Sequence, residues 1–146
     1  MGFTQRLRLI LFAFFCMEIM ALGVERFDLS FDEIKQLTAA DLQAKPKVEV
    51  YGQVIRFHSR DRGLFLFNGE SGIYVQPKNS WPKTIRLGSW IRVQGVAVEG
   101  IYYPIVRAEE VSVERKDAPL SEAAEFDPNL FYDPTIDSQW IQTSGL

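Results

Sequence analysis

The sequence predicts a small, mainly β protein: a closed antiparallel barrel of five strands that a short helix precedes. Three observations lead to this prediction. The chain has 146 residues, which is the size of one domain. Apolar and polar residues alternate over residues 48–54 with the period of a β-strand. Glycines lie inside two of the expected strands, at Gly52 and Gly95, where a barrel needs sharp bends and bulges.

The first 23 residues are predicted to be a signal peptide for export and no part of the fold. Residues 1–8 carry two arginines and no acid, and residues 9–17 are an unbroken apolar run. Ala21 and Gly23 supply the small residues that precede a cleavage site. The apolar run is shorter than the roughly 20 residues of a membrane span. An uncleaved membrane anchor is the alternative.

Removing this segment changes the charge and takes away the only cysteine. The whole chain has 16 Lys and Arg against 19 Asp and Glu, a net charge of −3. Residues 1–23 carry Arg6, Arg8 and Glu18, a net charge of +1, so residues 24–146 carry −3 − 1 = −4. Cys16 lies in the removed segment, which excludes a disulfide framework, thiol catalysis and a cysteine-based zinc site from the mature protein.

Residues 24–46 are predicted to form a short helical lead-in. Ser30 and Glu33 have the spacing of a capping box, so a helix is expected over residues 31–37. Residues 38–41 can start a second helical turn, which Pro46 ends. The apolar residues of the expected helix share one face: Phe31, Ile34 and Leu37.

Residues 47–115 are predicted to hold the five strands. The turn at residues 68–72 joins the second and third strands as a hairpin. Five strands with a longer connection between the third and the fourth match the plan of the OB-fold, a five-stranded Greek-key barrel. Another small barrel or a two-sheet sandwich is the alternative. The expected strands cover residues 48–58, 64–67, 73–76, 90–98 and 103–113.

The chain after the barrel is acidic. Residues 24–108 hold 12 basic and 9 acidic residues, whereas residues 109–146 hold 2 basic and 9 acidic residues. Residues 116–138 are therefore predicted to be an acidic linker. Residues 140–145 align with residues 47–52, the start of the first strand. We expect residues 139–146 to be the first strand of a truncated second module, and the chain to be a fragment.

Three stretches together resemble a known bacterial module. Residues 64–75 combine an apolar strand, a turn with an acidic residue, and Gly-Ile-Tyr-Val; residues 88–95 form a strand between two glycines; residues 137–145 repeat a strand opening. The pattern resembles the exported OB-fold-like module at the N-terminus of sensor histidine kinases and related membrane signalling proteins. Asn68 and Ser89 stand where that family usually has acids.

The resemblance implies a non-catalytic, periplasmic sensor module that binds a ligand or a partner. It also implies a membrane tether through a C-terminal region and contact with an adjacent module of the same longer chain. Two other functions stay open: a free periplasmic OB-fold protein that binds nucleic acid or glycan, and a structural spacer.

No pattern in the sequence predicts catalysis, a metal or a cofactor. His58 and Ser59 are neighbours on an expected strand, so their side chains point to opposite faces and do not form a base and nucleophile pair. The chain has no Gly-x-Ser-x-Gly motif and no Asp-rich calcium loop.

The candidate ligand site lies at the loops that OB-folds commonly use, between the first and second strands and between the fourth and fifth. One loop is basic and the other aromatic, which suits a small anionic ligand, a sugar or a protein partner; solvated arginines are the alternative. Nucleic acid is disfavoured by the predicted export and by the sequence pI of about 5.2. The candidate residues are Arg56, His58, Arg60, Arg62, Tyr74, Tyr102 and Tyr103.

Overall fold

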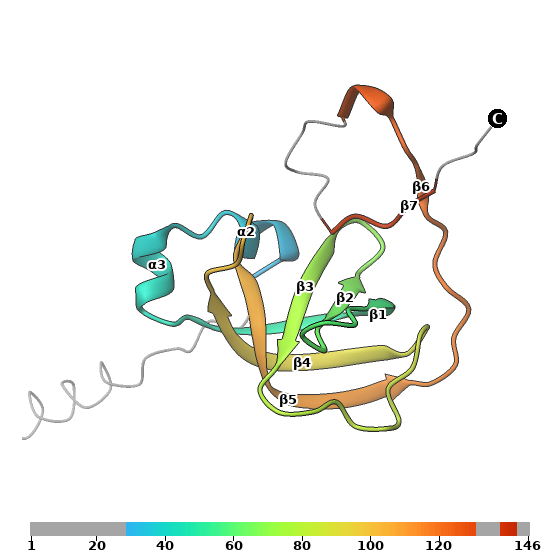
Figure 1. Ribbon diagram of the computed structural model, residues 1–146, viewed down its shortest axis with the longest axis horizontal. Coiled ribbons are helices and arrows are strands. Elements are labelled where there is room, and N and C mark those ends of the chain that lie inside the picture. The colour runs from blue at the N-terminus through green and yellow to red at the C-terminus, as the bar shows by residue number, and fades with distance from the viewer. Residues whose placement is uncertain (1–28, 131–137, 143–146) are drawn as a thin grey trace, which may run out of the picture.

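The structure, a computed structural model, describes residues 29–130 and 138–142. The predicted signal peptide, Cys16 and the last four residues of the expected second module lie outside these residues. Two short helices precede five strands, and two more very short strands follow (Figure 1). The elements are α2 (Phe31–Lys35), α3 (Ala39–Gln43), β1 (Lys47–Phe57), β2 (Leu64–Phe67), β3 (Gly72–Pro77), β4 (Trp90–Val98), β5 (Ile105–Arg115), β6 (Ala124–Glu125), a 3₁₀ turn (Pro128–Leu130) and β7 (Ile141–Gln142).

The hydrogen-bonded order of the strands closes on itself as β1-β2-β3-β5-β4, with β4 pairing back to β1. The first half of β1 pairs with β4, and its second half pairs with β2. A break in register between Val54 and Arg56 bends β1 from one neighbour to the other. The mainly β prediction with five strands is confirmed.

One pair of strands corrects the expectation of a wholly antiparallel barrel. β3 and β5 are parallel, with Val75 opposite Val106. The chain leaves β3 through the loop to β4, runs back along β1, and returns in β5 beside β3 in the same direction. A parallel contact of this kind joins strands that are distant in the sequence, so the alternation of residues within one strand does not reveal it.

The ends of two elements differ from the prediction for local reasons. β5 starts at Ile105 because Pro104 has no N–H to give to a ladder. The first helix ends at Lys35 because Thr38 caps a second helix of its own. In that helix the Asp41 carboxylate accepts from the Thr38 backbone N–H at 2.8 Å, which is a second capping box.

The helices close one side of the barrel core. Phe31 and Ile34 of α2 are 3% and 0% exposed and belong to the same apolar cluster as the inward residues of the strands. Leu37 and Leu42 pack against the edge of that cluster. The helical lead-in is thus part of the folded unit. The strand members of the cluster include Val48, Val50, Leu64, Leu66, Ile73, Val75, Ile91, Val93 and Val106.

Gln53, on the polar face of β1, is fully buried. Its Nε2 donates to the carbonyls of Gly88 at 3.1 Å and Pro119 at 2.7 Å. Its Oε1 accepts from the backbone N–H of Ser121 at 2.7 Å and from the Ser121 hydroxyl at 2.9 Å. Both donors and both lone-pair directions of the amide are used.

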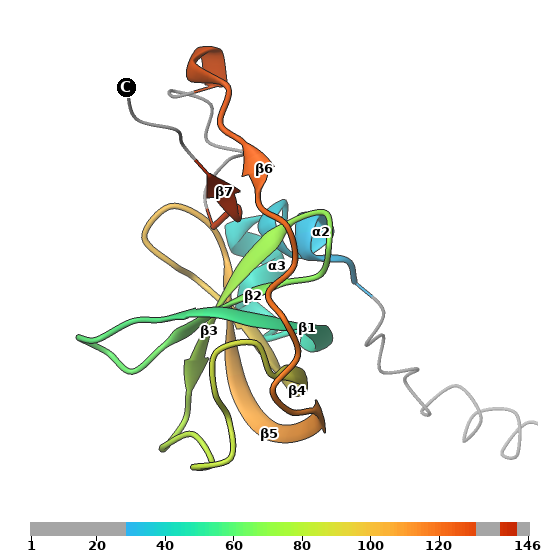
Figure 2. The same ribbon diagram turned by 90° about the vertical axis from the view of Figure 1, so that its right-hand side faces the viewer.

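The partners of Gln53 include residues 118–121, which we call the strap. Figure 2 shows the chain running back along the barrel from the end of β5 to β6. The backbone of Gly88 has φ +86°, and a Cβ there would lie 2.4 Å from the Ala118 carbonyl oxygen, so the strap approaches a glycine closely. The Trp140 indole donates to the Ser121 carbonyl at 2.8 Å. Part of the predicted linker is therefore bound to the barrel.

Replacing Gln53 by leucine should lower the stability of the whole domain. Gln53→Leu keeps the side chain's approximate size but leaves the carbonyls and the N–H of the strap without partners. We expect the free energy of unfolding, measured with urea, to fall by about 2 kcal/mol. Gln94→Leu is the matched control: Gln94 is exposed, and water can replace its hydrogen bond to the Glu49 carboxylate at 2.6 Å, so stability should change by less than about 0.5 kcal/mol. Equal stability of the two variants would contradict the role of Gln53.

Candidate ligand-binding surface

Residues 58–63 form a tight turn between β1 and β2. The His58 backbone N–H donates to the Gly63 carbonyl at 2.8 Å and closes the turn. Inside it, Asp61 Oδ1 accepts from the Gly63 N–H at 3.2 Å and lies 2.7 Å from His58 Nδ1. Arg62 takes a left-handed φ of 60°. The carboxylate of Asp61 thus holds both ends of the loop.

Tyr74 of β3 reaches the same carboxylate from across β2. Its hydroxyl donates to Asp61 Oδ1 at 2.5 Å. The ring meets Phe65 edge-on, with the ring centroids 4.9 Å apart, and His58 at 6.1 Å. A Cβ at Gly63 would lie only 1.8 Å from the Tyr74 hydroxyl, so glycine is required for this approach.

The structure therefore brings two of the predicted site residues, His58 and Tyr74, together through Asp61. Asp61 is not among the residues that the sequence singles out. The available signal was a single acid inside an otherwise basic turn, at positions 60–62.

The hydrogen bonds fix the protonation of this group. The Tyr74 hydroxyl lowers the pKa of Asp61, and the Gly63 N–H and His58 lower it further, although partial burial raises it. Burial raises the pKa of Tyr74, and the hydrogen bond to Asp61 and its negative charge add to the rise. Asp61 is therefore charged and Tyr74 neutral over a wide pH range.

The turn of residues 58–63 and the end of β1 carry exposed arginines that form no ion pair within the described residues. Arg56, Arg60 and Arg62 are exposed, and no ion pair involves them among residues 29–130 and 138–142. The Trp81 indole donates to the Arg62 carbonyl at 2.6 Å and ties the loop to residues 78–89, between β3 and β4. That second loop adds the exposed, equally unpaired Lys78, Lys83 and Arg86. We call loops 58–63 and 78–89, with Arg56, the basic loops.

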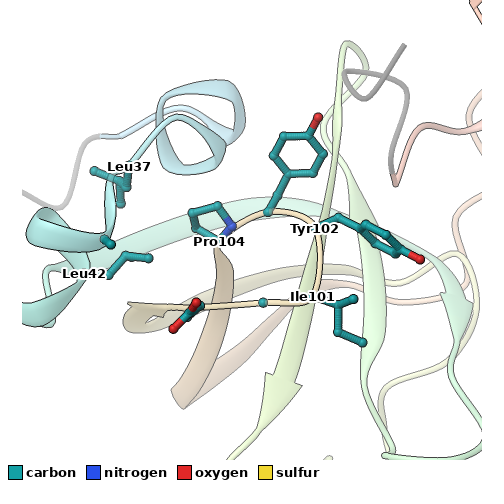
Figure 3. A pocket seen from close by; sticks show the side chains of 9 residues that line it. Leu37, Leu42, Ile101, Tyr102 and Pro104 are labelled. Atoms are coloured by element: carbon teal, nitrogen blue, oxygen red, sulfur yellow. The ribbon is translucent and has the colours of Figure 1, made fainter. Parts of the chain in front are cut away.

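The other predicted site residues lie elsewhere. Tyr102 and Tyr103 belong to loop 99–104, which lines a hollow with Leu37, Ala39 and Leu42 of the helical lead-in (Figure 3). Tyr102 is 81% exposed. The single site expected from the sequence is therefore two separate groups: one around Asp61 and one beside the helices.

Two further findings concern the described part of the chain. Its His, Cys, Asp and Glu side chains form no group of three or more that could hold a metal ion. Among the same residues, no helix has the length and apolar character to cross a membrane.

No protein-family model and no curated protein matches this chain. Solved structures do resemble it. The telomere capping protein Ten1 from Saccharomyces pombe aligns at 17% identity over 57% of this chain and 75% of that chain, with a TM-score of 0.44. The E. coli protein ygiW aligns at 12% identity over 53% and 87%, with a TM-score of 0.40. The OB-fold domain of the heme chaperone CcmE from Desulfovibrio vulgaris aligns at 16% identity over 51% and 90%, with a TM-score of 0.35.

These similar structures include OB-fold-like proteins, and nothing in the comparisons links the chain to sensor histidine kinases. The likeness is one of fold and gives this chain no ligand and no activity.

The hydrogen bond between Asp61 and Tyr74 can be tested by titration. Asp61→Asn removes the negative charge that opposes ionisation of the phenol, so the pKa of Tyr74 should fall toward that of the other tyrosines. In the unchanged protein, NMR of the tyrosine ring carbons should show Tyr74 still neutral above the pH of about 10 at which a free tyrosine ionises.

At acid pH the same hydrogen bond affects the stability of the protein through the lowered pKa of Asp61. Because the pKa of Asp61 is lowered by folding, its contribution to stability is present above the unfolded-state pKa and is lost as pH falls through the folded-state pKa.

For the titration of Tyr74, Asp41→Asn is the control, since it breaks a capping box that involves no tyrosine. The assignment fails if Tyr74 titrates alike in both variants.

Proposed function

We propose that this chain is a non-catalytic binding module of the OB-fold type, a Greek-key barrel that binds an anionic ligand at its basic loops. The observation that carries the proposal is the set of exposed, unpaired cations on two loops that the Trp81 indole holds together. The whole chain is negative, at −3, so this positive surface is local and does not follow from the composition.

The hydrogen-bond order at Asp61 supports a binding role over a catalytic one. In a nucleophile relay the histidine lies between the acid and the nucleophile. Here the carboxylate lies between His58 and Tyr74, and both side chains contact the same oxygen. The group is arranged to hold the loop, and the raised pKa of Tyr74 opposes its use as a nucleophile.

Arginines suit the proposed ligand. A guanidinium offers several N–H donors in one plane and binds carboxylate, sulfate or phosphate groups through two bonds at once. Because Arg60 and Arg62 are exposed, they keep their hydration when free, and the attraction weakens as salt rises. A small anion or an acidic sugar fits this surface better than a neutral ligand.

The strap offers a route from ligand to the rest of the protein. The basic loop 78–89 ends at Gly88 and Ser89, and the Gly88 carbonyl accepts from the same Gln53 amide that holds Pro119. A ligand that shifts this loop would therefore also strain the hydrogen bonds between Gln53 and the strap. We place this module, by its leader sequence and by the resemblance, in the periplasm as part of a longer membrane-tethered signalling chain, where the strap would pass the shift onward. Cell fractionation tests the export.

Retention on a heparin column, a sulfated glycan support, tests the binding proposal. The purified protein should bind at low salt despite its negative net charge and elute as salt rises. Arg60→Glu/Arg62→Glu reverses two charges, adds four units of negative charge, and should abolish retention near 0.1 M salt, where charges interact over about 10 Å.

The matched control is Lys45→Glu/Lys116→Glu, which makes the same change in net charge at exposed lysines outside the basic loops. It should elute close to the unchanged protein. Equal loss of retention in the two double variants, or no retention of the unchanged protein, would refute a local anionic site.

A further inference from the structure

Loop 99–104 and the helical lead-in enclose a hollow that is separate from the basic loops. It has a volume of about 230 Å³. Leu37, Ala39 and Leu42 form one wall, and Pro104 stands opposite them (Figure 3). The lining therefore comes from two parts of the chain, the helices and the connection between β4 and β5.

The same loop exposes two large apolar side chains. Ile101 is 92% exposed and Tyr102 is 81% exposed. The other exposed large hydrophobic residues of the described chain reach at most 51%, at Leu87. Exposed apolar side chains gathered around a hollow mark interaction sites, and tyrosine is enriched among the residues that carry binding energy.

Two features define what would fill the hollow. Strand pairing closes the barrel, so a partner cannot extend the barrel sheet with a strand and has to bind through side chains. Glu99 is the one charged residue of the lining, and no ion pair of Glu99 occurs among the described residues. A cation beside an apolar group complements this surface, because it would pair with the Glu99 carboxylate while the apolar group meets the apolar walls.

We propose that this hollow is a docking site for a segment of a partner protein that presents an apolar side chain next to a lysine or arginine. The apolar side chain enters between Leu42 and Pro104, and the cation pairs with Glu99. Because the walls come from the lead-in and from the barrel, the bound segment holds the two together. The site is independent of the proposed anion binding.

An NMR titration of the full chain tests this. The probes are N-acetyl-tryptophanyl-lysine amide and N-acetyl-tryptophanyl-glutamate amide, each up to about 10 mM, in the range expected for a ligand of this size. The lysine probe should shift the backbone amides of residues 39–42 and 99–103, and the glutamate probe should not. Glu99→Lys and Ile101→Ser/Tyr102→Ser should each weaken binding about fivefold or more, which is a change near 1 kcal/mol.

The controls change like residues elsewhere on the surface. Glu70→Lys lies in the turn between β2 and β3, and Leu87→Ser lies in the loop between β3 and β4; both side chains are exposed and should leave the titration unchanged. All these variants concern exposed side chains, so their unaltered spectra check the fold.

Three results would overturn the proposal. The first is no shift with the lysine probe, or equal shifts with both probes. The second is binding of tryptamine, a small apolar amine, as tight as that of the peptide, which would make the ligand a metabolite. The third is Ile101- and Tyr102-dependent binding to phosphatidylcholine vesicles, which would make the loop a membrane contact. If the unchanged protein is not retained on heparin but the peptide titration behaves as expected, only the anionic site is refuted.

Discussion

The structure depends on one residue of β1, at the point where that strand changes neighbours. Gln53 lies opposite Trp90 of β4 and opposite Phe67 of β2, so the backbone closes the barrel there. Its side chain then binds Gly88, Pro119 and Ser121, so the same residue fixes the loop before β4 and the strap after β5. A buried amide is stable only when all its hydrogen bonds are made, and the strap makes three of the four. Barrel closure and the path of the C-terminal chain are therefore set by one group.

The position of Gln53 also separates the two surfaces. After Gln53, β1 bends at Val54–Arg56 and leads into the turn of residues 58–63, which Asp61 and Tyr74 hold in place. Before it, β1 starts next to the helices and the end of β4, where Lys47 lies opposite Val96. Loop 99–104 follows that end of β4 and meets Leu37 and Leu42. The basic loops and the apolar hollow thus belong to the two ends of one strand and share no residue.

The sequence was sufficient for the parts that local rules determine. Alternation predicts β1, the apolar run 64–67 and the strand 90–98 to within a residue, and the spacing of Ser30 and Glu33 predicts the start of the first helix. It was insufficient where distant residues meet. Gln53 occupies a polar position of the alternating pattern, and it is buried because the strap covers it from 66 residues away. The same holds for Tyr74, whose contact with Asp61 spans 13 residues and joins strand β3 to the loop between β1 and β2. It also holds for Tyr102 and Tyr103, which the fold places beside the helices instead of beside the basic turn.

The two surfaces bind their ligands through different interactions, so an experiment can tell binding at one from binding at the other. The cations of the basic loops are exposed, so their attraction for an anion acts through water and is screened within about 8 Å at physiological ionic strength. The hollow offers apolar walls, and burial of apolar surface is insensitive to moderate salt and grows with the area removed from water, at roughly 25 cal/mol per Å². Only the pair between Glu99 and a cation would be screened there, and exposed pairs contribute about 1 kcal/mol or less. A ligand of the basic loops is therefore released by salt, whereas a segment in the hollow stays bound. Both can bind the domain at the same time because the two sites share no side chain.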